Sequence, residues 1–207
     1  MTAPIELAAQ LIILLYSVVL HEVSHGYVAR ALGDPTAERV GRLTLNPIKH
    51  LDLFGSFVLP LFLVAVGSPF LFGYAKPVPY NPQNLRNRRW GPVQVALAGP
   101  LTNIMLALLF SVLAQFMAPL LPPLAQNLLW YAVIINLVLA AFNLFPVPPL
   151  DGHWLLMAVL PTGSVGLKLA LYRYQWLFLI LILFFVFPRI IYPIQYLTYL
   201  LTGYIPG

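Results

Sequence analysis

Long apolar runs fill most of the 207-residue chain, and short polar or proline-rich stretches separate them. Several runs reach the length of about 20 residues that a helix needs to cross a bilayer. The pattern therefore predicts a bundle of five to six transmembrane segments. In chain order, the apolar runs cover residues 5–32, 53–66, 91–118, 124–145, 151–160 and 169–201.

Two stretches depart from this pattern. The run at residues 53–66 has only about fourteen residues and contains Gly55 and Pro60, so it suits a re-entrant segment as well as a full crossing. Residues 71–80 hold several prolines in an alternating pattern, which predicts an extended, hairpin-like element at the membrane edge. The expected fold class is an all-α polytopic membrane protein, with residues 1–207 forming a single membrane-embedded domain.

The composition supports this class. Apolar residues make up 60% of the chain and charged residues only 8%, whereas soluble domains have about 25% charged residues. A chain this apolar cannot cover a water-facing surface, so we expect the lipid bilayer to be its solvent. The net charge of +5 is modest and no basic block has interleaved aromatics, so we expect no nucleic-acid partner. The absence of Cys excludes disulfides, thiol nucleophiles and cysteine zinc sites.

The orientation depends on the short run at residues 53–66, because positive charges lie on both sides of it. They are Arg30, Arg39, Arg42 and Lys49 before the run, and Lys76, Arg86, Arg88 and Arg89 after it. A full crossing would place the two clusters on opposite sides, against the positive-inside rule. A re-entrant run would leave both in the cytoplasm, and we favour this interpretation for a multi-pass protein of the cell membrane. The N-terminus lacks a basic region and carries Glu6, so we do not expect a cleavable signal peptide.

The motif His21-Glu22-Val23-Ser24-His25 lies inside the first apolar run. On a helix, residues four apart lie on the same face, so His21 and His25 can bind one zinc ion. Glu22 can then reach a water at the metal as a general base. Ionisable groups at membrane depth are costly and usually functional. The motif predicts a hydrolytic zinc site with one Zn²⁺ per chain.

A hydrolytic zinc site needs a third protein ligand. Asp151 is the strongest candidate, because it follows the proline-rich break NLFPVPPLDG, where the backbone can turn a side chain inward. Its alternative role is to cap the next helix. His153 is the rival ligand, although two residues at this spacing diverge on a helix, and an interfacial role suits it better. We interpret His50 as a solvated surface histidine and Asp34, Glu38 and Asp52 as loop acids.

Two asparagines lie close to these elements in the sequence. Asn143 ends the fourth long run, and its amide could donate a hydrogen bond to the scissile carbonyl and to the oxyanion that develops from it. Asn103 lies near the small residues Ala98 and Gly99, which permit close helix approach. For Asn103 we favour a structural role, in which its amide bonds a backbone group of a neighbouring helix. For Asn143 we favour a substrate-facing role.

In this order and within membrane segments, HEVSHGYVA, AGPLTN and NLFPVPPLDG resemble the site-2 protease family of intramembrane zinc metalloproteases. GRLTLNP and AKPVPYNPQNLRN are similar to connectors of its compact members, and the resemblance covers residues 11–160. It implies that His21, His25 and Asp151 bind zinc, that Glu22 is the catalytic base and that Asn143 contacts substrate. It also implies a helical bundle that cuts transmembrane or membrane-tethered proteins within or next to their spanning helices, as in regulated intramembrane proteolysis.

The chain departs from many relatives in two respects. Its HExxH motif lies in the first predicted helix, and we expect no PDZ or CBS domain. We therefore expect substrate selection by the membrane core or by a separate regulatory protein. A helical substrate must unwind before attack, and the extended stretch could pair with it by β-augmentation. We assign this substrate contact to Tyr74, Lys76 and Val78.

Three other functions are weighed against proteolysis. A membrane metal transporter needs several acids or histidines along a path, but the membrane acids nearly run out after Glu22 and Asp151. A non-enzymatic scaffold has no need of Glu22 between two histidines. A non-proteolytic membrane metalloenzyme acting on a lipid or small molecule would share every ligand, and only the family resemblance disfavours it.

Overall fold

The computed structural model describes residues 3–52, 76–117 and 120–204, together with the single residues 55, 58, 62 and 65. All regular structure in these residues is helical. The elements are α1 (Ala3–Ala31), α2 (Thr36–Arg39), η1 (Pro47–His50), η3 (Pro82–Asn84), α4 (Gly91–Met117), α5 (Pro123–Asn143), α6 (His153–Val159), α7 (Val165–Arg173), α8 (Gln175–Leu181), η5 (Ile182–Val186) and α9 (Phe187–Thr202). The all-helical prediction is confirmed for this part of the chain.

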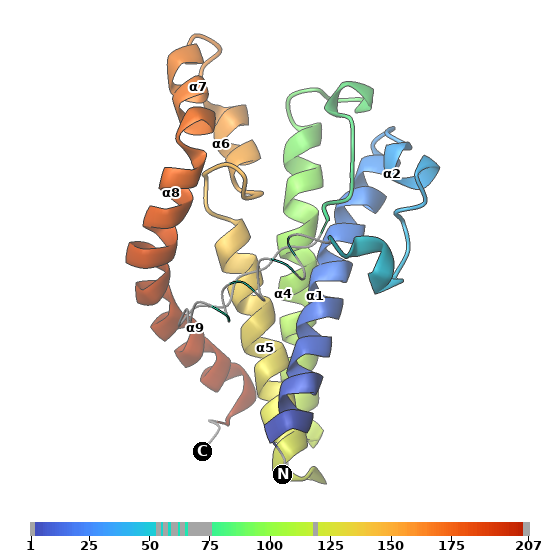
Figure 1. The fold of residues 1–207 in the computed structure, drawn as a ribbon, viewed down its shortest axis with the longest axis vertical. Helices are drawn as coiled ribbons and strands as arrows, with labels where there is room; N and C mark the ends of the chain where they lie inside the picture. Colours follow the sequence, from blue (N-terminus) through green and yellow to red (C-terminus); the bar gives the residue numbers. More distant parts are fainter. Residues whose placement is uncertain are drawn as a thin grey trace.

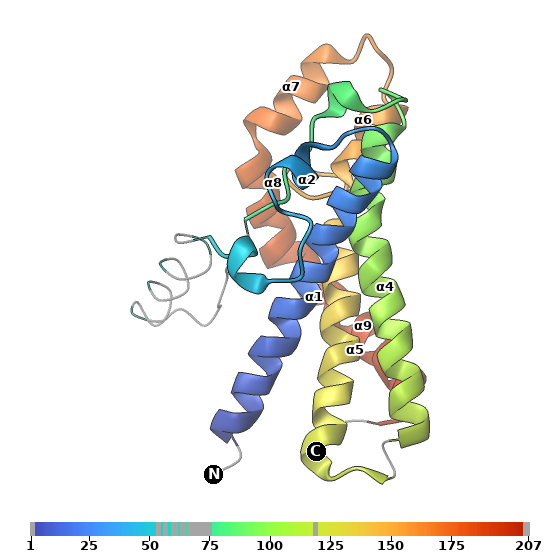
Figure 2. The ribbon, with the colours of Figure 1, turned by 90° about the vertical axis from the view of Figure 1, so that its right-hand side faces the viewer.

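Helices α1, α4 and α5 pack against one another, and α9 packs on α4 and α5 (Figure 1). Four helical stretches are long and apolar enough to cross a membrane: Pro4–Ala31, Gly91–Met117, Pro123–Asn143 and Gln175–Thr202. The last of these joins α8, η5 and α9 into one irregular helix. Figure 2 shows that the N-terminal end of α1 stands apart from α4 and α5, so α1 joins the bundle mainly through its second half.

The short run predicted at residues 151–160 does not form a membrane span. It folds into α6, which has seven residues and is therefore about 10 Å long. Gly152 precedes this helix, and its N–H donates to the Asn143 carbonyl at 2.7 Å. The segment returns directly after α5 and brings Asp151 back toward α1.

The run at residues 53–66 and most of the predicted hairpin at residues 71–80 lie outside the described residues. Residues 76–81, which are described, form a non-helical strap without an assigned strand, and the strap crosses the Glu22 region of α1. Its first residue, Lys76, donates its backbone N–H to the His50 carbonyl at 2.8 Å. The chain thus leaves the connector after His50 and returns to the same point at Lys76.

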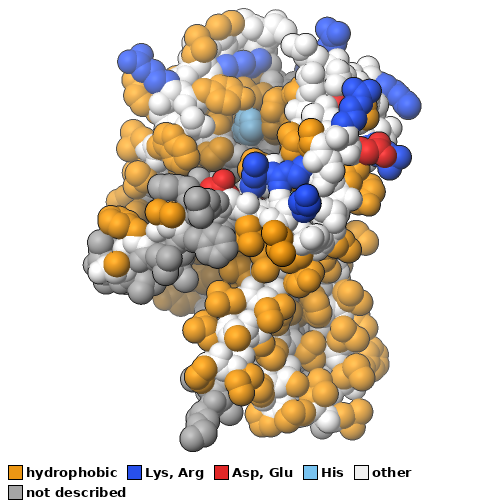
Figure 3. Space-filling view, turned by 45° about the vertical axis from the view of Figure 1, so that its right-hand side comes forward, with side chains coloured by type: hydrophobic (Ala, Val, Ile, Leu, Met, Phe, Trp, Pro, Cys, Tyr) orange, Lys and Arg blue, Asp and Glu red, His pale blue; other side chains and the backbone are white. Residues whose placement is uncertain are grey.

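The two positive clusters lie at one end of the bundle. The Arg86 N–H donates to the Leu32 carbonyl at 3.0 Å, so the second connector lies against the end of α1 from which the first one starts. In Figure 3, Lys and Arg gather over one half of the visible face, and in the other half the coloured side chains are hydrophobic. This arrangement agrees with the interpretation in which both connectors face the same side of the membrane.

Asp34 holds the strap against the end of α1. Its carboxylate is fully buried. Oδ1 accepts hydrogen bonds from the backbone N–H and hydroxyl of Thr36 and from Asn84 Nδ2, and Oδ2 accepts one from the Asn81 N–H at 2.6 Å. Asp34 lies in a loop, as predicted, but it is buried and not solvated, because three later residues supply its hydrogen-bond donors.

Candidate metal centre

His21 and His25 lie one turn apart on α1, and both side chains are buried. Their ring centroids are 4.7 Å apart with nearly perpendicular planes. Val19 and Val23 of the same helix are also buried, so this part of α1 is enclosed on several sides. The predicted four-residue spacing therefore does bring both imidazoles to one location.

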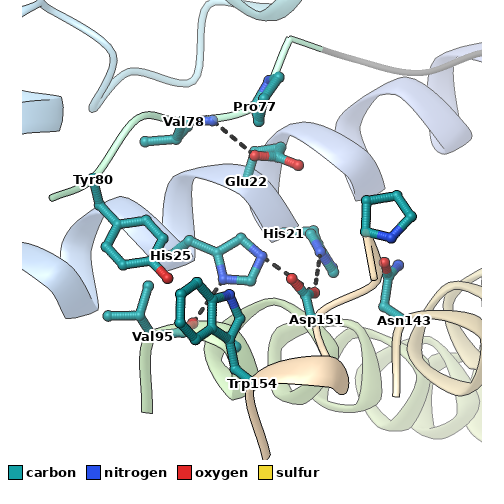
Figure 4. A pocket seen from close by; sticks show the side chains of 12 residues that line it. His21, Glu22, His25, Pro77, Val78, Tyr80, Val95, Asn143, Asp151 and Trp154 are labelled. Atoms are coloured by element: carbon teal, nitrogen blue, oxygen red, sulfur yellow. Dashed lines mark hydrogen bonds and ion pairs between the residues drawn. The ribbon is translucent and has the colours of Figure 1, made fainter. Parts of the chain in front are cut away.

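Asp151 meets the two histidines from the turn between α5 and α6 (Figure 4). Its Oδ2 atom lies 3.1 Å from His21 Nε2 and 3.4 Å from His25 Nε2. Among the described residues, these three form the one group of His, Asp and Glu side chains arranged to hold a metal ion, with ligand atoms within 4.8 Å of one another.

The hydrogen bonds of the proposed ligand side chains show whether their free lone pairs could bind a cation. His25 Nδ1 lies 2.7 Å from the Val95 carbonyl, which can only accept, so Nδ1 must carry a proton. In the neutral ring, Nε2 then has a lone pair directed at Asp151. Asp151 Oδ2 is itself buried without a hydrogen bond, and its closeness to the two imidazoles is an ion pair only when one of them is protonated. Electron-pair donors that face one point in this way suit a metal ion such as Zn²⁺.

Gly99 of α4 makes room for the two imidazoles. A Cβ atom at this position would lie 2.5 Å from His21 Nε2 and 2.5 Å from His25 Nε2. Real Cβ atoms do not approach other heavy atoms this closely. The AGP sequence therefore allows α4 to pack against the metal-facing nitrogens themselves.

Glu22 lies beside the group and contacts the strap. Its Oε2 accepts a hydrogen bond from the Val78 N–H at 2.9 Å, and its other carboxylate oxygen is not part of this bond (Figure 4). Both residues line one pocket with the three candidate ligands. The other residues lining it are Pro77, Tyr80, Val95, Ala96, Asn143, Pro149 and Trp154. The pocket thus joins a metal-binding group, a carboxylate and backbone from the strap.

The three residues assigned to substrate contact differ in position. Val78 is buried and lines the pocket. Lys76 is exposed and is not among the lining residues, although its N–H bonds to the connector. Tyr74 lies outside the described residues. Substrate pairing along the strap stays a prediction.

Asn143 does reach the pocket from the end of α5. Its Nδ2 donates to the Leu139 carbonyl at 2.9 Å within its own helix. This bond fixes the orientation of the amide and leaves the substrate-facing role as a prediction.

The remaining candidate residues have structural contacts. Asn103 is fully buried, but its Oδ1 lies 2.5 Å from His21 Nδ1, so it contacts a side chain of the site and not a backbone group. His50 is also fully buried, with Nε2 2.8 Å from the Thr44 carbonyl, so its interpretation as a solvated histidine was wrong. His153 packs against Trp154 and Tyr172 and lies outside the metal-binding group. Burial lowers the pKa of His153 below its ordinary value, since its contact with the Leu150 carbonyl offsets the desolvation only in part.

The sequence did not indicate Tyr80 or Trp154 as residues of the site. Their rings meet edge to face with centroids 6.2 Å apart, and both line the pocket. The Tyr80 hydroxyl is buried without a hydrogen-bond partner. Burial raises its pKa, and the nearby Asp151 charge raises it further. Neither residue belongs to a motif with fixed spacing, so no sequence signal could have found them.

The sequence profile of peptidase family M50 matches residues 9–120 and 113–185. This chain belongs to peptidase family M50. The family is that of the site-2 proteases, so the resemblance found in the motifs is confirmed, and the chain is a membrane zinc metalloprotease.

Several M50 relatives are similar over much of the chain. "Putative zinc metalloprotease YwhC" of Bacillus subtilis is 41% identical over 77% of this chain and 73% of its own length. "Putative zinc metalloprotease Rip2" of Mycolicibacterium smegmatis is 31% identical over 85% of this chain and 66% of its own length. "Putative zinc metalloprotease MJ0611" of Methanocaldococcus jannaschii is 31% identical over 65% of this chain and 62% of its own length. No solved structure matches the chain significantly.

Proposed function

We propose that this zinc metalloprotease hydrolyses peptide bonds within or next to the transmembrane segments of membrane proteins, as in regulated intramembrane proteolysis. His21, His25 and Asp151 bind one zinc ion per chain, and Glu22 is the catalytic base. One observation supports this most directly: the three donors converge beside Glu22 on a helix that is long and apolar enough to cross a membrane.

Bound zinc supplies a Lewis acid that makes water a stronger nucleophile and polarises a carbonyl. Glu22 accepts the proton of the attacking water and later delivers it to the leaving nitrogen. The bond from the Val78 N–H to Oε2 orients the Glu22 carboxylate for this task. His21, His25 and Asp151 hold their donor atoms toward one point of the pocket.

Asn143 is assigned to the substrate. The position of its amide on the pocket wall supports a hydrogen bond to the scissile carbonyl and to the charge that develops there. Val78, Lys76 and Tyr74 are assigned to an unwound substrate strand, and the position of Val78 in the pocket wall supports a contact with the substrate. Residues 1–207 act as a single membrane-embedded domain in the cell membrane, and either the membrane core or a separate regulatory protein selects substrates.

The test is Glu22→Gln in purified protein. The variant removes the base without removing a proposed ligand, so we expect it to bind about one zinc ion per chain. Cleavage of a membrane-spanning substrate should fall by about 10²- to 10⁴-fold. Metal analysis and cleavage of a labelled substrate in liposomes measure the two effects.

The same preparation separates the alternatives. Unchanged cleavage by Glu22→Gln would exclude the proteolytic mechanism, and a parent protein without bound metal would exclude the site. Zinc flux through parent proteoliposomes would favour the transporter, while turnover of lipid without turnover of protein would favour a different metalloenzyme.

A further inference from the structure

Behind His21, on the side away from Asp151, three buried polar side chains connect α1, α4 and α5. Asn103 and Asn136 are fully buried, and Ser17 is 3% exposed. Asn103 Oδ1 lies 2.5 Å from His21 Nδ1, and Asn103 Nδ2 donates to Asn136 Oδ1 at 2.8 Å. Asn136 Nδ2 in turn donates to Ser17 Oγ at 2.9 Å and to the Ala132 carbonyl at 2.8 Å. The hydrogen bonds form one continuous chain.

This chain of hydrogen bonds has a fixed donor-to-acceptor direction. A backbone carbonyl can only accept, so the Asn136 atom next to the Ala132 oxygen must be its amide nitrogen. Asn136 therefore presents Oδ1 to Asn103, and the Asn103 atom that meets this oxygen must be its own amide nitrogen. The Asn103 oxygen is then left for His21. A reversal of either amide would set two donors or two acceptors against each other in a buried site.

We propose that Asn136, acting through Asn103, is a positioning residue that fixes the tautomer of His21. An acceptor at Nδ1 requires the proton to be there, so Nε2 keeps its lone pair on the side of Asp151. This inference rests on the proposed role of His21 as a zinc ligand, because only that role needs a free lone pair on Nε2. We call the Ala132 carbonyl, Asn136 and Asn103 the amide relay.

His25 shows the same arrangement without the relay. Its Nδ1 meets the Val95 carbonyl at 2.7 Å. Each histidine is thus polarised by a backbone carbonyl, directly for His25 and through two amides for His21. The same polarity at both rings directs both Nε2 atoms toward one point, as a shared metal requires.

The alternative role for buried amides between membrane helices is to hold the helices together. That role predicts lower stability when an amide is lost but does not involve the imidazole tautomer. The tautomer and the metal affinity therefore distinguish the two roles.

The first experiment compares zinc affinity in detergent by chelator competition. Asn136→Leu breaks the relay without touching a proposed ligand, and we expect zinc binding about 10- to 100-fold weaker than in the parent. Ser111→Ala is the matched control, because Ser111 of α4 is also buried, and among the described residues its hydroxyl bonds the Ala107 carbonyl of its own helix. It should bind zinc like the parent. Asn136→Ala, which leaves room for a water of no fixed polarity, serves if the leucine variant does not fold.

A double variant tests whether the donor-to-acceptor direction of the hydrogen bonds matters for zinc binding. Both carboxylate oxygens of Asn103→Asp accept hydrogen bonds, so an acceptor faces His21 without help from Asn136. In that background, Asn136→Leu should no longer weaken zinc binding. An equal loss in both backgrounds would contradict the relay.

The second experiment uses ¹⁵N NMR of the histidine rings in metal-free protein. His21, assigned by the loss of its signals in His21→Gln, should be only the Nδ1–H tautomer in the parent and a mixture in Asn136→Leu. An unchanged tautomer, unchanged zinc affinity, or an equal loss in Ser111→Ala would each overturn the proposal. A parent that binds no zinc would instead contradict the proposed function, while the tautomer would still test the relay.

Discussion

The two halves of α1 are both rich in apolar residues, but they lie in different surroundings. None of the side chains of residues 4–16 is buried, whereas in residues 17–31 seven residues are: Ser17, Val19, His21, Val23, His25, Gly26 and Ala29. The first half faces outward, and the second is enclosed by α4, α5 and the connectors. Apolar character therefore indicates the membrane, while the polar and small residues among the apolar ones mark the half that packs.

The largest expected effect comes from filling the space between α4 and the two imidazoles in the second half of α1. Gly99→Ala places a Cβ against both metal-facing nitrogens, so we expect zinc binding and cleavage to be lost. Metal content and substrate cleavage measure this. Gly166→Ala on α7 is the control, because nothing lies within 4 Å of a Cβ there. Full zinc binding in Gly99→Ala would show that the imidazoles are not held as described.

A smaller effect, on the cleavage rate, is expected from a change at Asn143 in the pocket wall. Asn143→Ala removes the amide assigned to the developing oxyanion, so cleavage should slow by about 10²-fold. Zinc affinity should not change, because Asn143 is outside the metal-binding group. Single-turnover cleavage and chelator competition separate the two quantities, and an unchanged cleavage rate would remove Asn143 from the mechanism.

The stability of the C-terminal end of α1 and its contacts is expected to depend on the charge of Asp34. Burial alone would raise its pKa, but the hydrogen bonds from Thr36, Asn84 and Asn81 outweigh burial and lower it below 3.8. The ionised carboxylate therefore stabilises the fold fully above the ordinary pKa, and this contribution is lost as the pH falls through the lowered folded-state value.

Asp34→Asn tests this contribution. It should reduce the free energy of unfolding by roughly 2 kcal/mol at neutral pH, because a charged acceptor of several bonds is lost. It should also flatten the decline in stability toward low pH. Thermal unfolding in detergent at several pH values measures both. A variant whose decline with pH matches that of the parent would assign the acid sensitivity to another group.

The smallest expected effect is a change in unfolding free energy when one apolar side chain from each half of α1 is shortened. Val19 is 0% exposed and Ile12 is 57% exposed. Val19→Ala leaves a cavity and should cost roughly 1–3 kcal/mol of unfolding free energy. Ile12→Ala, facing outward, should cost less than about 0.5 kcal/mol. Equal costs would mean that the first half of α1 also packs against protein.

The sequence predicted the parts of the site that have a fixed spacing or a chain break. His21, Glu22 and His25 follow from helical periodicity, and Asp151 follows from the proline-rich turn that breaks α5. The long helices follow from apolar length, but α6 does not, because a largely apolar run of only ten residues suits a short buried helix better than a span.

The contacts that order the site could not be predicted, because they join residues far apart in the chain. The Val95 carbonyl that polarises His25 is a backbone group, which every residue has. His50 was interpreted as solvated because its neighbours in the sequence are polar, but it is buried and its ring contacts the Thr44 carbonyl. Asp34 accepts hydrogen bonds from the distant Asn81 and Asn84 as well as from nearby Thr36. Asn103 was assigned a structural role, and only the position of Asn136 shows that its direction matters.

The hydrogen bond between the Lys76 N–H and the His50 carbonyl has a consequence for how the protein tolerates changes in chain length. It closes a loop whose two ends meet at one point beside the strap. The entropic cost of closing such a loop grows only slowly with its length. The positions of α1, the strap and the metal centre therefore depend little on how many residues separate His50 from Lys76.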